Sequence, residues 1–492
     1  MKLSLAVNAL TCMSFLGAIA PTFGAKECTQ GKLFVSSTGD TSLRVFDLSK
    51  GIENLSVEST MNIPGTGPEL NLNKDSSGKV VAVIYRGTEA SNYQDGAVRW
   101  VDTGVSVEPH DEHAHIEYET PIMIDNAAFD CARAIHFVPH DSKIAIFCDG
   151  AITEDALVNT TVWVVDESLF GADESAVIFK TTLPSSHHGV AVPVDDDHVM
   201  YSLPSPERLA GNFSRSFSLP HTFEVVDYEG NVLHSIDDTS DVDRSCSGFH
   251  GSWAKENTFA LACDDQHGGI LVVDYDEGTA VYESRALAYP ENFPDHRTGG
   301  FAEHHMAPLA VGNFAATGQA HLVRFDPTSD VSITDDNVMT LGEERQCAFK
   351  FEESEGQLLM VLMPDGTFNV YEVEPEWKLL VSEKIVPDMV DCAEVLFAPG
   401  YGQAFIMTGY NNKMYAIDLT HVDEGELETS ETTLDFQPYS AVVAGAPEEA
   451  ACKLSELEHD HEGGVVVQGS SAPVKTSVSA GMFLAIALIA MV

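Results

Sequence analysis

The sequence predicts an all-β fold, a single β-propeller of eight blades with four antiparallel strands each; seven blades are the alternative. Short β-type runs alternate with Gly, Asp, Pro and Asn turns, and helical periodicity is scarce. One run that ends in an acid recurs about every 50 residues, which is the size of a propeller blade. Its copies are LRVFD (43–47), VRWVD (98–102), VWVVD (162–166), FEVVD (223–227), ILVVD (270–274), LVRFD (322–326), FNVYE (368–372) and MYAID (414–418).

The two ends of the repeat region indicate how the ring closes. Two β-type runs precede most copies and another follows, but the first copy has only KLFVSST (32–38) before it. The apolar run YSAVVAGA (439–446) follows the last copy and has no repeat of its own. We expect it to supply the missing inner strand of the first blade, since full closure removes unpaired strand edges. The propeller then occupies residues 26–452.

Composition limits the function classes. The 492 residues include 44% hydrophobic residues, enough for a large core, and carry a formal net charge of −50. Phosphate backbones repel so acidic a chain, which excludes nucleic acid as a partner. The sequence contains no G-x-S-x-G nucleophile elbow, phosphate-binding loop or H-E-x-x-H helix. None of these catalytic motifs therefore argues for an enzyme.

Both ends of the chain predict a secreted or cell-surface protein. Residues 1–25 have the pattern of a secretory signal peptide, with Lys2 ahead of an apolar run. Residues 453–479 are acidic and rich in small residues, which predicts a disordered stalk. The apolar tail 480–492, preceded by small residues and a polar spacer, is typical of a GPI-anchor signal; a plain membrane tail is the alternative. We expect contact with a membrane only through this C-terminal anchor.

Sequons and cysteines agree with an oxidising compartment outside the cytosol. Asn54, Asn159 and Asn212 begin N-glycosylation sequons. Eight cysteines remain after the signal peptide. Cys131 and Cys148 have the same spacing as Cys246 and Cys263, and both pairs predict disulfides within repeats. Cys28 and Cys452 form a third pair near the two ends. Cys347 and Cys392 begin repeats, and whether they are bonded stays open.

Histidines recur near one position in four consecutive repeats. The first strand of a propeller blade lines the central channel. When the four repeats are aligned on the polar ends of their second strands, these histidines fall at or beside the start of the first strand. One such histidine would more often be structural, but four in register favour a Zn²⁺ site, since three or four imidazoles can complete it. The candidate ligands are His136, His188, His250 and either His304 or His305, with His187 as support and Asp149 and Asp264 as carboxylate ligands or as acceptors for imidazole N–H.

A second histidine cluster lies in VEPHDEHAHIEYETP (107–121), after the third strand of the second blade. His110, His113 and His115 stand among acids, as in short metal-capture tracts. Their spacing matches no closed structural site, so we expect a mobile loop that binds metal weakly. A solvated acidic loop is the alternative.

Several motifs together resemble the AztD-type periplasmic zinc metallochaperones. These motifs are HHGVAVP (187–193), IHFVPHDSKIAIFCDG (135–150), the Cys246-Ser-Gly-Phe-His250-Gly unit, and D-x-G-V-x-x-x-x-H-x-x-H-A from Asp102 to Ala114. Proteins of that family are bacterial β-propellers that hand zinc to the binding protein of a zinc transporter. The resemblance covers most of residues 30–450. It implies zinc in the channel at His136, His188 and His250, and a metal-accepting loop at His110, His113 and His115.

The sequence therefore predicts a zinc-binding protein that is not an enzyme, an extracytoplasmic zinc chaperone or scavenger. We expect it to hold Zn²⁺ in the propeller channel and to use the His-rich loop for loading or transfer. Sequons, the extra cysteines and the predicted anchor indicate a eukaryotic-like relative, and a zinc-accepting transporter or binding protein is the expected partner. Two alternatives stay open. One is a metal-dependent hydrolase or lactonase of the propeller type, and the other is a cell-surface interaction propeller with incidental histidines.

Overall fold

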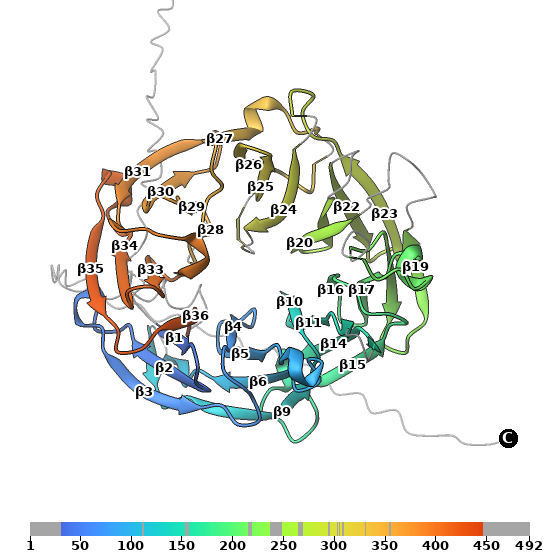
Figure 1. Cartoon of the computed structure of the whole chain (residues 1–492), viewed down its shortest axis with the longest axis horizontal. Helices are drawn as coiled ribbons and strands as arrows, with labels where there is room; N and C mark the ends of the chain where they lie inside the picture. The colour runs from blue at the N-terminus through green and yellow to red at the C-terminus, as the bar shows by residue number, and fades with distance from the viewer. Residues whose placement is uncertain are drawn as a thin grey trace, which may run out of the picture.

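The blades form a closed ring with their first strands around its centre (Figure 1). The computed structural model describes residues 31–445 except for 111–112, 153–156, 215–218, 237–247, 264–268, 294–295, 303, 305, 308, 330 and 354–355. Eight four-stranded antiparallel sheets make up the ring, which confirms the predicted all-β propeller and its blade number. Each sheet runs from an inner strand at the channel to an outer strand at the periphery.

The first four blades contain these strands, in order from the inner to the outer strand. Blade one is β36 (Pro438–Ala444), β1 (Lys32–Ser37), β2 (Ser42–Asp47) and β3 (Val57–Asn62). Blade two is β4 (Asn71–Lys74), β5 (Val80–Tyr85), β6 (Ala97–Asp102) and β9 (Ile122–Asp130). Blade three is β10 (Ala134–His140), β11 (Lys143–Cys148), β14 (Thr161–Asp166) and β15 (Val177–Thr182). Blade four is β16 (Ala191–Pro193), β17 (His198–Leu203), β18 (Thr222–Asp227) and β19 (Val232–Ile236).

The other four blades follow without interruption. Blade five is β20 (Phe249–Lys255), β21 (Thr258–Cys263), β22 (Gly269–Asp276) and β23 (Val281–Leu287). Blade six is β24 (Arg297–Ala302), β25 (Ala310–Ala316), β26 (Gln319–Phe325) and β27 (Val338–Gly342). Blade seven is β28 (Ala348–Phe351), β29 (Leu358–Leu362), β30 (Thr367–Glu372) and β31 (Lys378–Lys384). Blade eight is β32 (Val395–Pro399), β33 (Gln403–Thr408), β34 (Lys413–Asp418) and β35 (Glu428–Thr433).

Two small hairpins and a few helical turns interrupt the pattern. The hairpins are β7 (Val105–His110) with β8 (His113–Tyr118), and β12 (Ala151–Ile152) with β13 (Leu157–Val158). The one described α-helix is α1 (Pro206–Leu209). The 3₁₀ turns are η1 (Ile52–Asn54), η2 (Glu89–Ser91), η3 (Glu167–Leu169), η5 (Asp335–Asn337), η6 (Cys392–Glu394) and η7 (Val422–Glu424). Within the described ranges, no helix has both the length and the apolar composition needed to cross a bilayer.

The ring closes through the last strand of the propeller. β36 pairs antiparallel with β1, with Phe34 opposite Val442 and Leu33 opposite Val443. The last described strand thus provides the inner strand of the blade that contains the first three described strands (Figure 1). This confirms the closure predicted from the unpaired apolar run near residue 440. Closure satisfies the backbone groups of β1 that would otherwise form an open sheet edge.

The acid that ends each repeat has a structural role in several blades. The carboxylates of Asp47, Asp166, Asp326 and Asp418 each accept a hydrogen bond from the backbone N–H of the Ser or Thr two residues later. This turn, in which a side chain replaces a backbone acceptor, reverses the chain after the third strand. The recurring acid therefore stops the third strand in these blades.

The apolar core is divided into clusters between blades. Each of eight buried clusters joins the facing sides of two adjacent sheets, one cluster for each pair of neighbouring blades. Between blades three and four, for example, Ala145 and Phe147 pack with Ala191 and Val199. Since both faces of every sheet are buried in this way, a single blade cannot hold its fold without its neighbours.

The two ends of the channel can be told apart by strand direction. We call the end where the inner strands begin, and the second strands finish, the first rim. The opposite end, with the turns from inner to second strands, is the second rim. A third strand finishes at the second rim because it runs parallel to the inner strand of its sheet.

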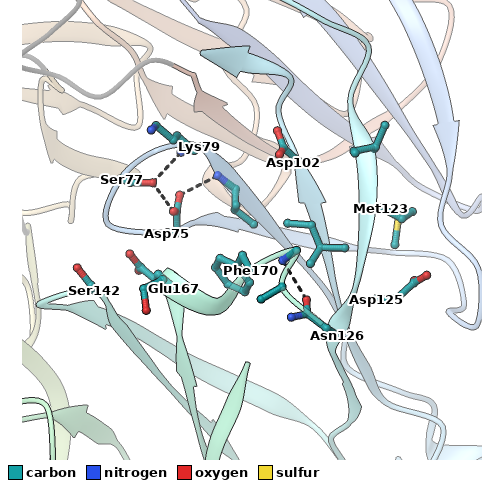
Figure 2. Close-up of a pocket in the computed structure, with 16 residues that line it drawn as sticks. Asp75, Ser77, Lys79, Asp102, Met123, Asp125, Asn126, Ser142, Glu167 and Phe170 are labelled. Atoms are coloured by element: carbon teal, nitrogen blue, oxygen red, sulfur yellow. Dashed lines mark hydrogen bonds between the residues drawn. The ribbon is translucent and has the colours of Figure 1, made fainter. Parts of the chain in front are cut away.

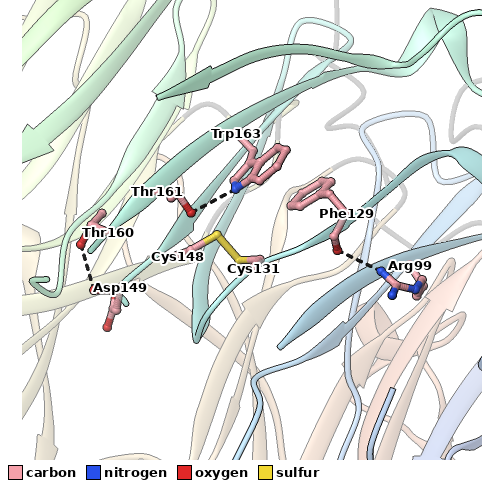
Figure 3. The surroundings of a disulfide bond; sticks show 8 residues. All are labelled: Arg99, Phe129, Cys131, Cys148, Asp149, Thr160, Thr161 and Trp163. Atoms are coloured by element: carbon pink, nitrogen blue, oxygen red, sulfur yellow. Dashed lines mark hydrogen bonds between the residues drawn. A yellow bond between two sulfur atoms is a disulfide. The ribbon is translucent and has the colours of Figure 1, made fainter. Parts of the chain in front are cut away.

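Two disulfides hold connections between blades. Cys131 is bonded to Cys148, with Cα atoms 5.7 Å apart, and ties the segment before β10 to the end of β11 (Figure 3). This confirms one predicted pair. Cys347 is bonded to Cys392, which joins the starts of blades seven and eight and settles the state of two cysteines that the sequence left open. Cys263 is also disulfide-bonded; its predicted partner Cys246, and the pair Cys28 and Cys452, lie outside the described residues.

Candidate metal centre

Three histidines from three consecutive blades meet at the first rim. His136 is the third residue of β10, His188 lies three residues before β16, and His250 is the second residue of β20. We call them the channel histidines. The rings of His136 and His188 lie with centroids 4.9 Å apart, and those of His188 and His250 5.5 Å apart. The predicted register of these three residues is therefore found in the structure.

The His-Gly pairs in the sequence reflect close packing beside two of these rings. A Cβ on Gly189 would lie 2.2 Å from the Ser202 hydroxyl oxygen and 2.6 Å from the Phe147 ring. A Cβ on Gly251 would lie 2.7 Å from the Cα of Gly300 in the next blade. Real side chains are not found at such distances, so only glycine lets the chain beside each histidine pack this closely.

The distance between the first two histidines suits a tetrahedral zinc ion. The Nε2 atoms of His136 and His188 are 3.4 Å apart. Two nitrogens bound to one tetrahedral Zn²⁺ at 2.0–2.1 Å would be separated by about 3.3 Å, and their ring centroids by roughly 5 Å. Packing of the protein alone therefore gives this pair the spacing that the metal would require.

Hydrogen bonds fix which nitrogen two of the three rings present. The Nδ1 atom of His188 lies 3.0 Å from Oδ2 of Asp149, and Nδ1 of His250 lies 2.5 Å from the carbonyl oxygen of Gly299. Because both acceptors favour a proton on Nδ1, the Nε2 atoms of these two rings are left with their lone pairs. A carboxylate behind a histidine is also the usual support for a zinc ligand.

Asp149 is a buried carboxylate directly after β11, next to the Cys131–Cys148 bridge (Figure 3). It is 5% exposed, and burial raises the pKa of its carboxyl group, while the bond to His188 acts in the opposite direction. Its other oxygen, Oδ1, has no hydrogen-bond partner within the described part of the chain. The contact with His188 makes Asp149 an acceptor for imidazole N–H, one of the two roles that the sequence left open.

His136 is held in its neutral form. Burial in the channel lowers the pKa of His136 to about 3, and the nearby His188, His250 and Arg86 lower it further. A neutral imidazole has a free lone pair for a metal, whereas a protonated one would repel it. His136 therefore needs no deprotonation at neutral pH before it can act as a ligand.

His187 has a structural environment. It is 1% exposed, its Nε2 lies 3.2 Å from the carbonyl oxygen of Ser202, and its Nδ1 lies 3.3 Å from the Thr160 hydroxyl. Burial lowers the pKa of His187 to about 4. Its backbone N–H also donates to the carbonyl oxygen of Asp149. These contacts connect the segment before His188 to the segment around Asp149, which agrees with a supporting role.

His304, one of the two candidates for the fourth ligand, does not lie with the channel histidines. His304 lies in the connection between β24 and β25, at the second rim, where its ring contacts Gly356 of blade seven. Blades three and five join their inner and second strands through tight turns, but blade six uses the longer segment between Ala302 and Ala310. In blade six, a histidine located by its distance before the second strand therefore falls in this connection and not at the start of β24. His305 and Asp264 lie outside the described residues.

The second histidine cluster forms a hairpin and not an open loop. The backbone register of β7 and β8 places His110 opposite His113 and Glu108 opposite His115. We call His110, His113 and His115 the hairpin histidines. The hairpin connects the end of β6 with the start of β9, as predicted, and therefore lies at the second rim. The channel histidines lie at the other rim, and a seven-residue inner strand such as β10 spans roughly 20 Å between the two rims.

A cavity at the second rim was not anticipated from the sequence. It has a volume of about 700 Å³ and lies between blades two and three, where Asp75 and Glu167 face each other (Figure 2). Burial, followed by the charge of Asp75, raises the pKa of Glu167 to about 7. Both carboxylates already accept hydrogen bonds, Asp75 from Val80 N–H and Glu167 from Ser76 N–H. The pair thus stabilises the turn between β4 and β5.

Three arginines near the channel histidines were also missed. Arg86 follows β5, Arg133 precedes β10 and Arg208 lies in α1, all at the first rim. Their only sequence signal is rarity, since the chain has 26 lysines and arginines against 76 acids.

The described residues include no group of three or more His, Cys, Asp or Glu side chains already drawn together closely enough to hold a metal. A metal at the channel histidines would therefore require a small rearrangement of the rings.

The fold and this arrangement define a class: an eight-bladed β-propeller with histidines from three consecutive blades at one rim of its channel. The chain is similar to the zinc chaperone AztD of Citrobacter koseri, with 24% identity over 449 residues, which are 90% of this chain and 93% of the relative. Two crystal structures of Citrobacter koseri AztD, one of them the apo protein, match with a TM-score of 0.65, at 24% and 23% identity. Each covers 84% of this chain and 98% of the matched chain. No family model matches. The resemblance stated from the sequence motifs is confirmed.

Proposed function

We propose that the protein binds Zn²⁺ through the Nε2 atoms of His136, His188 and His250 and acts as an extracytoplasmic zinc chaperone or scavenger. The observation that supports this most directly is the 3.4 Å separation of the His136 and His188 Nε2 atoms, with Asp149 behind His188. The similar protein is named a zinc chaperone, not an enzyme, in agreement with the prediction that this protein is not an enzyme.

The third ligand would come from a rotation of His250. Its ring is exposed, and one hydrogen bond to Gly299 holds it. Turning the ring between rotamers until its Nε2 faces the other two would give up this hydrogen bond in exchange for a bond to the metal. Three imidazoles then leave the fourth tetrahedral position open, as in zinc sites that exchange a ligand. A site with an exposed third ligand can release its metal to an acceptor.

The hairpin histidines would form a separate and weaker capture site. Their hairpin starts at the second rim, whereas the channel histidines lie at the first rim. We propose that the hairpin raises the local zinc concentration, and that a zinc-accepting transporter or binding protein draws on the channel histidines at the first rim.

The cellular setting that we propose is the cell surface. Two disulfides in the described part of the chain suit an oxidising compartment. Residues 26–452 would form the mature propeller, 453–479 a stalk and 480–492 a GPI-anchor signal. Glycans would occupy Asn54 and Asn212, which are exposed, and Asn159, which is half-buried.

Calorimetric titration of the chain with zinc tests the proposal. We expect one tight site per molecule, and a loss of at least a hundredfold in affinity in the double variant His188→Ala with His250→Ala, since two of three ligands are removed. His421→Ala is the matched control, because that histidine is exposed on blade eight, away from the channel. Unchanged affinity in the double variant would rule out the channel histidines as the site.

A further inference from the structure

Three arginines of this acidic chain lie at the first rim, in the connections around blades two to four. The backbone connects Arg86, Arg133 and Asp149 directly: Arg133 N–H donates to the carbonyl oxygen of Arg86, and Asp149 N–H donates to that of Arg133, both at 3.1 Å. On the other side of His188, the Nε atom of Arg208 donates to the carbonyl oxygen of Ser186 at 2.8 Å. The charge of Arg86 acts on His136, and the charges of Arg86 and Arg133 act on Asp149 behind His188.

None of these arginines forms an ion pair in the described ranges, although the charge of Asp149 acts on Arg208 and opposes the fall in its pKa that burial causes. Arg133 lies over the Tyr93 ring at 5.3 Å, and Arg208 lies over the Phe213 ring at 5.5 Å. Arg208 is only 7% exposed, and its Nη1 atom is buried with no hydrogen-bond partner among the described residues. Buried charges in proteins are normally paired, because removing a guanidinium from water is costly. An unpaired buried donor next to a candidate metal site therefore indicates a place for an anion.

A zinc ion would add its positive charge to that of the three arginines. Three neutral imidazoles would leave its double positive charge uncompensated, and Asp149 is the one carboxylate among the described residues that contacts a channel histidine. The arginines would then repel the metal that the histidines attract. A carboxylate would offset the zinc charge and reduce its repulsion by the arginines, since it can bind zinc through one oxygen and accept hydrogen bonds from a guanidinium.

We propose that the zinc ion at the channel histidines takes a carboxylate from another molecule as its fourth ligand, and that Arg86, Arg133 and Arg208 hold this carboxylate. The inference depends on the proposed zinc site and adds the chemistry of the molecule that shares the metal. That molecule is a small carboxylate bound with the metal, or an Asp or Glu side chain of the protein that delivers or receives it. In either case the arginines select zinc that arrives together with a negative charge.

Zinc titrations with and without a carboxylate test this. The full chain is titrated in a sulfonate buffer with perchlorate as the salt, and then with added acetate or with a short peptide of Asp and Gly, all at one ionic strength. We expect acetate or the peptide to raise zinc affinity about tenfold in a saturable manner, the size of one charge-assisted hydrogen-bonded contact. A response to acetate identifies a small carboxylate, and a response to the peptide alone identifies a protein side chain.

Variants separate this inference from the zinc site itself. In Arg86→Gln with Arg133→Gln, both exposed in the structure, the enhancement should fall below about twofold, while zinc affinity without carboxylate stays the same or rises because repulsion is reduced. Lys79→Gln, an exposed change at the second rim, should behave as the unaltered chain does. Zinc binding that neither acetate nor the peptide changes would overturn the carboxylate proposal alone. A chain that binds no zinc in any buffer would overturn both proposals.

Discussion

Replacing Asp149 by asparagine isolates the support behind one proposed zinc ligand. The carboxylate Oδ2 lies 3.0 Å from Nδ1 of His188, and the residue is 5% exposed. Asparagine has the same shape and can still accept a hydrogen bond, but it lacks the negative charge that makes the imidazole a stronger donor to the metal. Loss of such support lowers metal affinity 10- to 100-fold, or about 1.4–2.7 kcal/mol. We expect Asp149→Asn to weaken zinc binding by this amount.

Competition with a chromophoric zinc chelator at pH 7.4 measures the change. Asp173→Asn, which alters an exposed carboxylate on the same blade, is the control and should bind zinc as the unaltered chain does. Thermal unfolding of both variants checks that the fold is retained. Affinity of Asp149→Asn within threefold of the control would refute the supporting role. A loss beyond a thousandfold would instead indicate that Asp149 is itself a ligand.

Four further predictions concern the rest of the molecule. The folded protein holds the proton of Glu167 up to pH 7, above its ordinary pKa of 4.5, so stability should fall as pH rises between these values. Glu167→Gln should flatten that slope and raise the free energy of unfolding at pH 7.5 by roughly 1–3 kcal/mol in urea titrations. Replacing Cys347 and Cys392 by serine should lower the free energy of unfolding by about 2–4 kcal/mol, because the disulfide closes a long loop. Truncation before β36 should abolish cooperative unfolding, since it opens the ring; circular dichroism on heating measures this. Alanine at all three hairpin histidines should leave the tight zinc site in calorimetry unchanged and remove only weaker binding.

The repeats in the sequence were enough to predict the ring and its closure. A strand-ending acid recurs because Asp47, Asp166 and their equivalents build the same turn after a third strand. Apolar residues recur because every sheet is buried on both faces. The first repeat lacked an inner strand and one apolar run was left over after the last repeat, so the sequence predicted that this run, β36, pairs with β1.

Part of the site could not be predicted from these patterns. His136, His188 and His250 were found because each lies near the start of an inner strand. His304 was misplaced because the length of a connection between strands is independent of the repeat. The rim on which the hairpin lies could have been derived, since a segment after a third strand must start at the second rim. The arginines had no periodic signal, because each lies in a connection with its own local structure.

X-ray absorption at the zinc edge tests the central claim most directly. For the chain loaded with one equivalent of zinc, we predict three imidazole ligands and one further light-atom ligand at about 2.0–2.1 Å. The imidazole contribution should fall by two in His188→Ala with His250→Ala and stay the same when the hairpin histidines are replaced. A sulfur ligand, a shell without imidazole, or an imidazole signal that disappears only with the hairpin histidines would contradict a zinc site at the channel histidines.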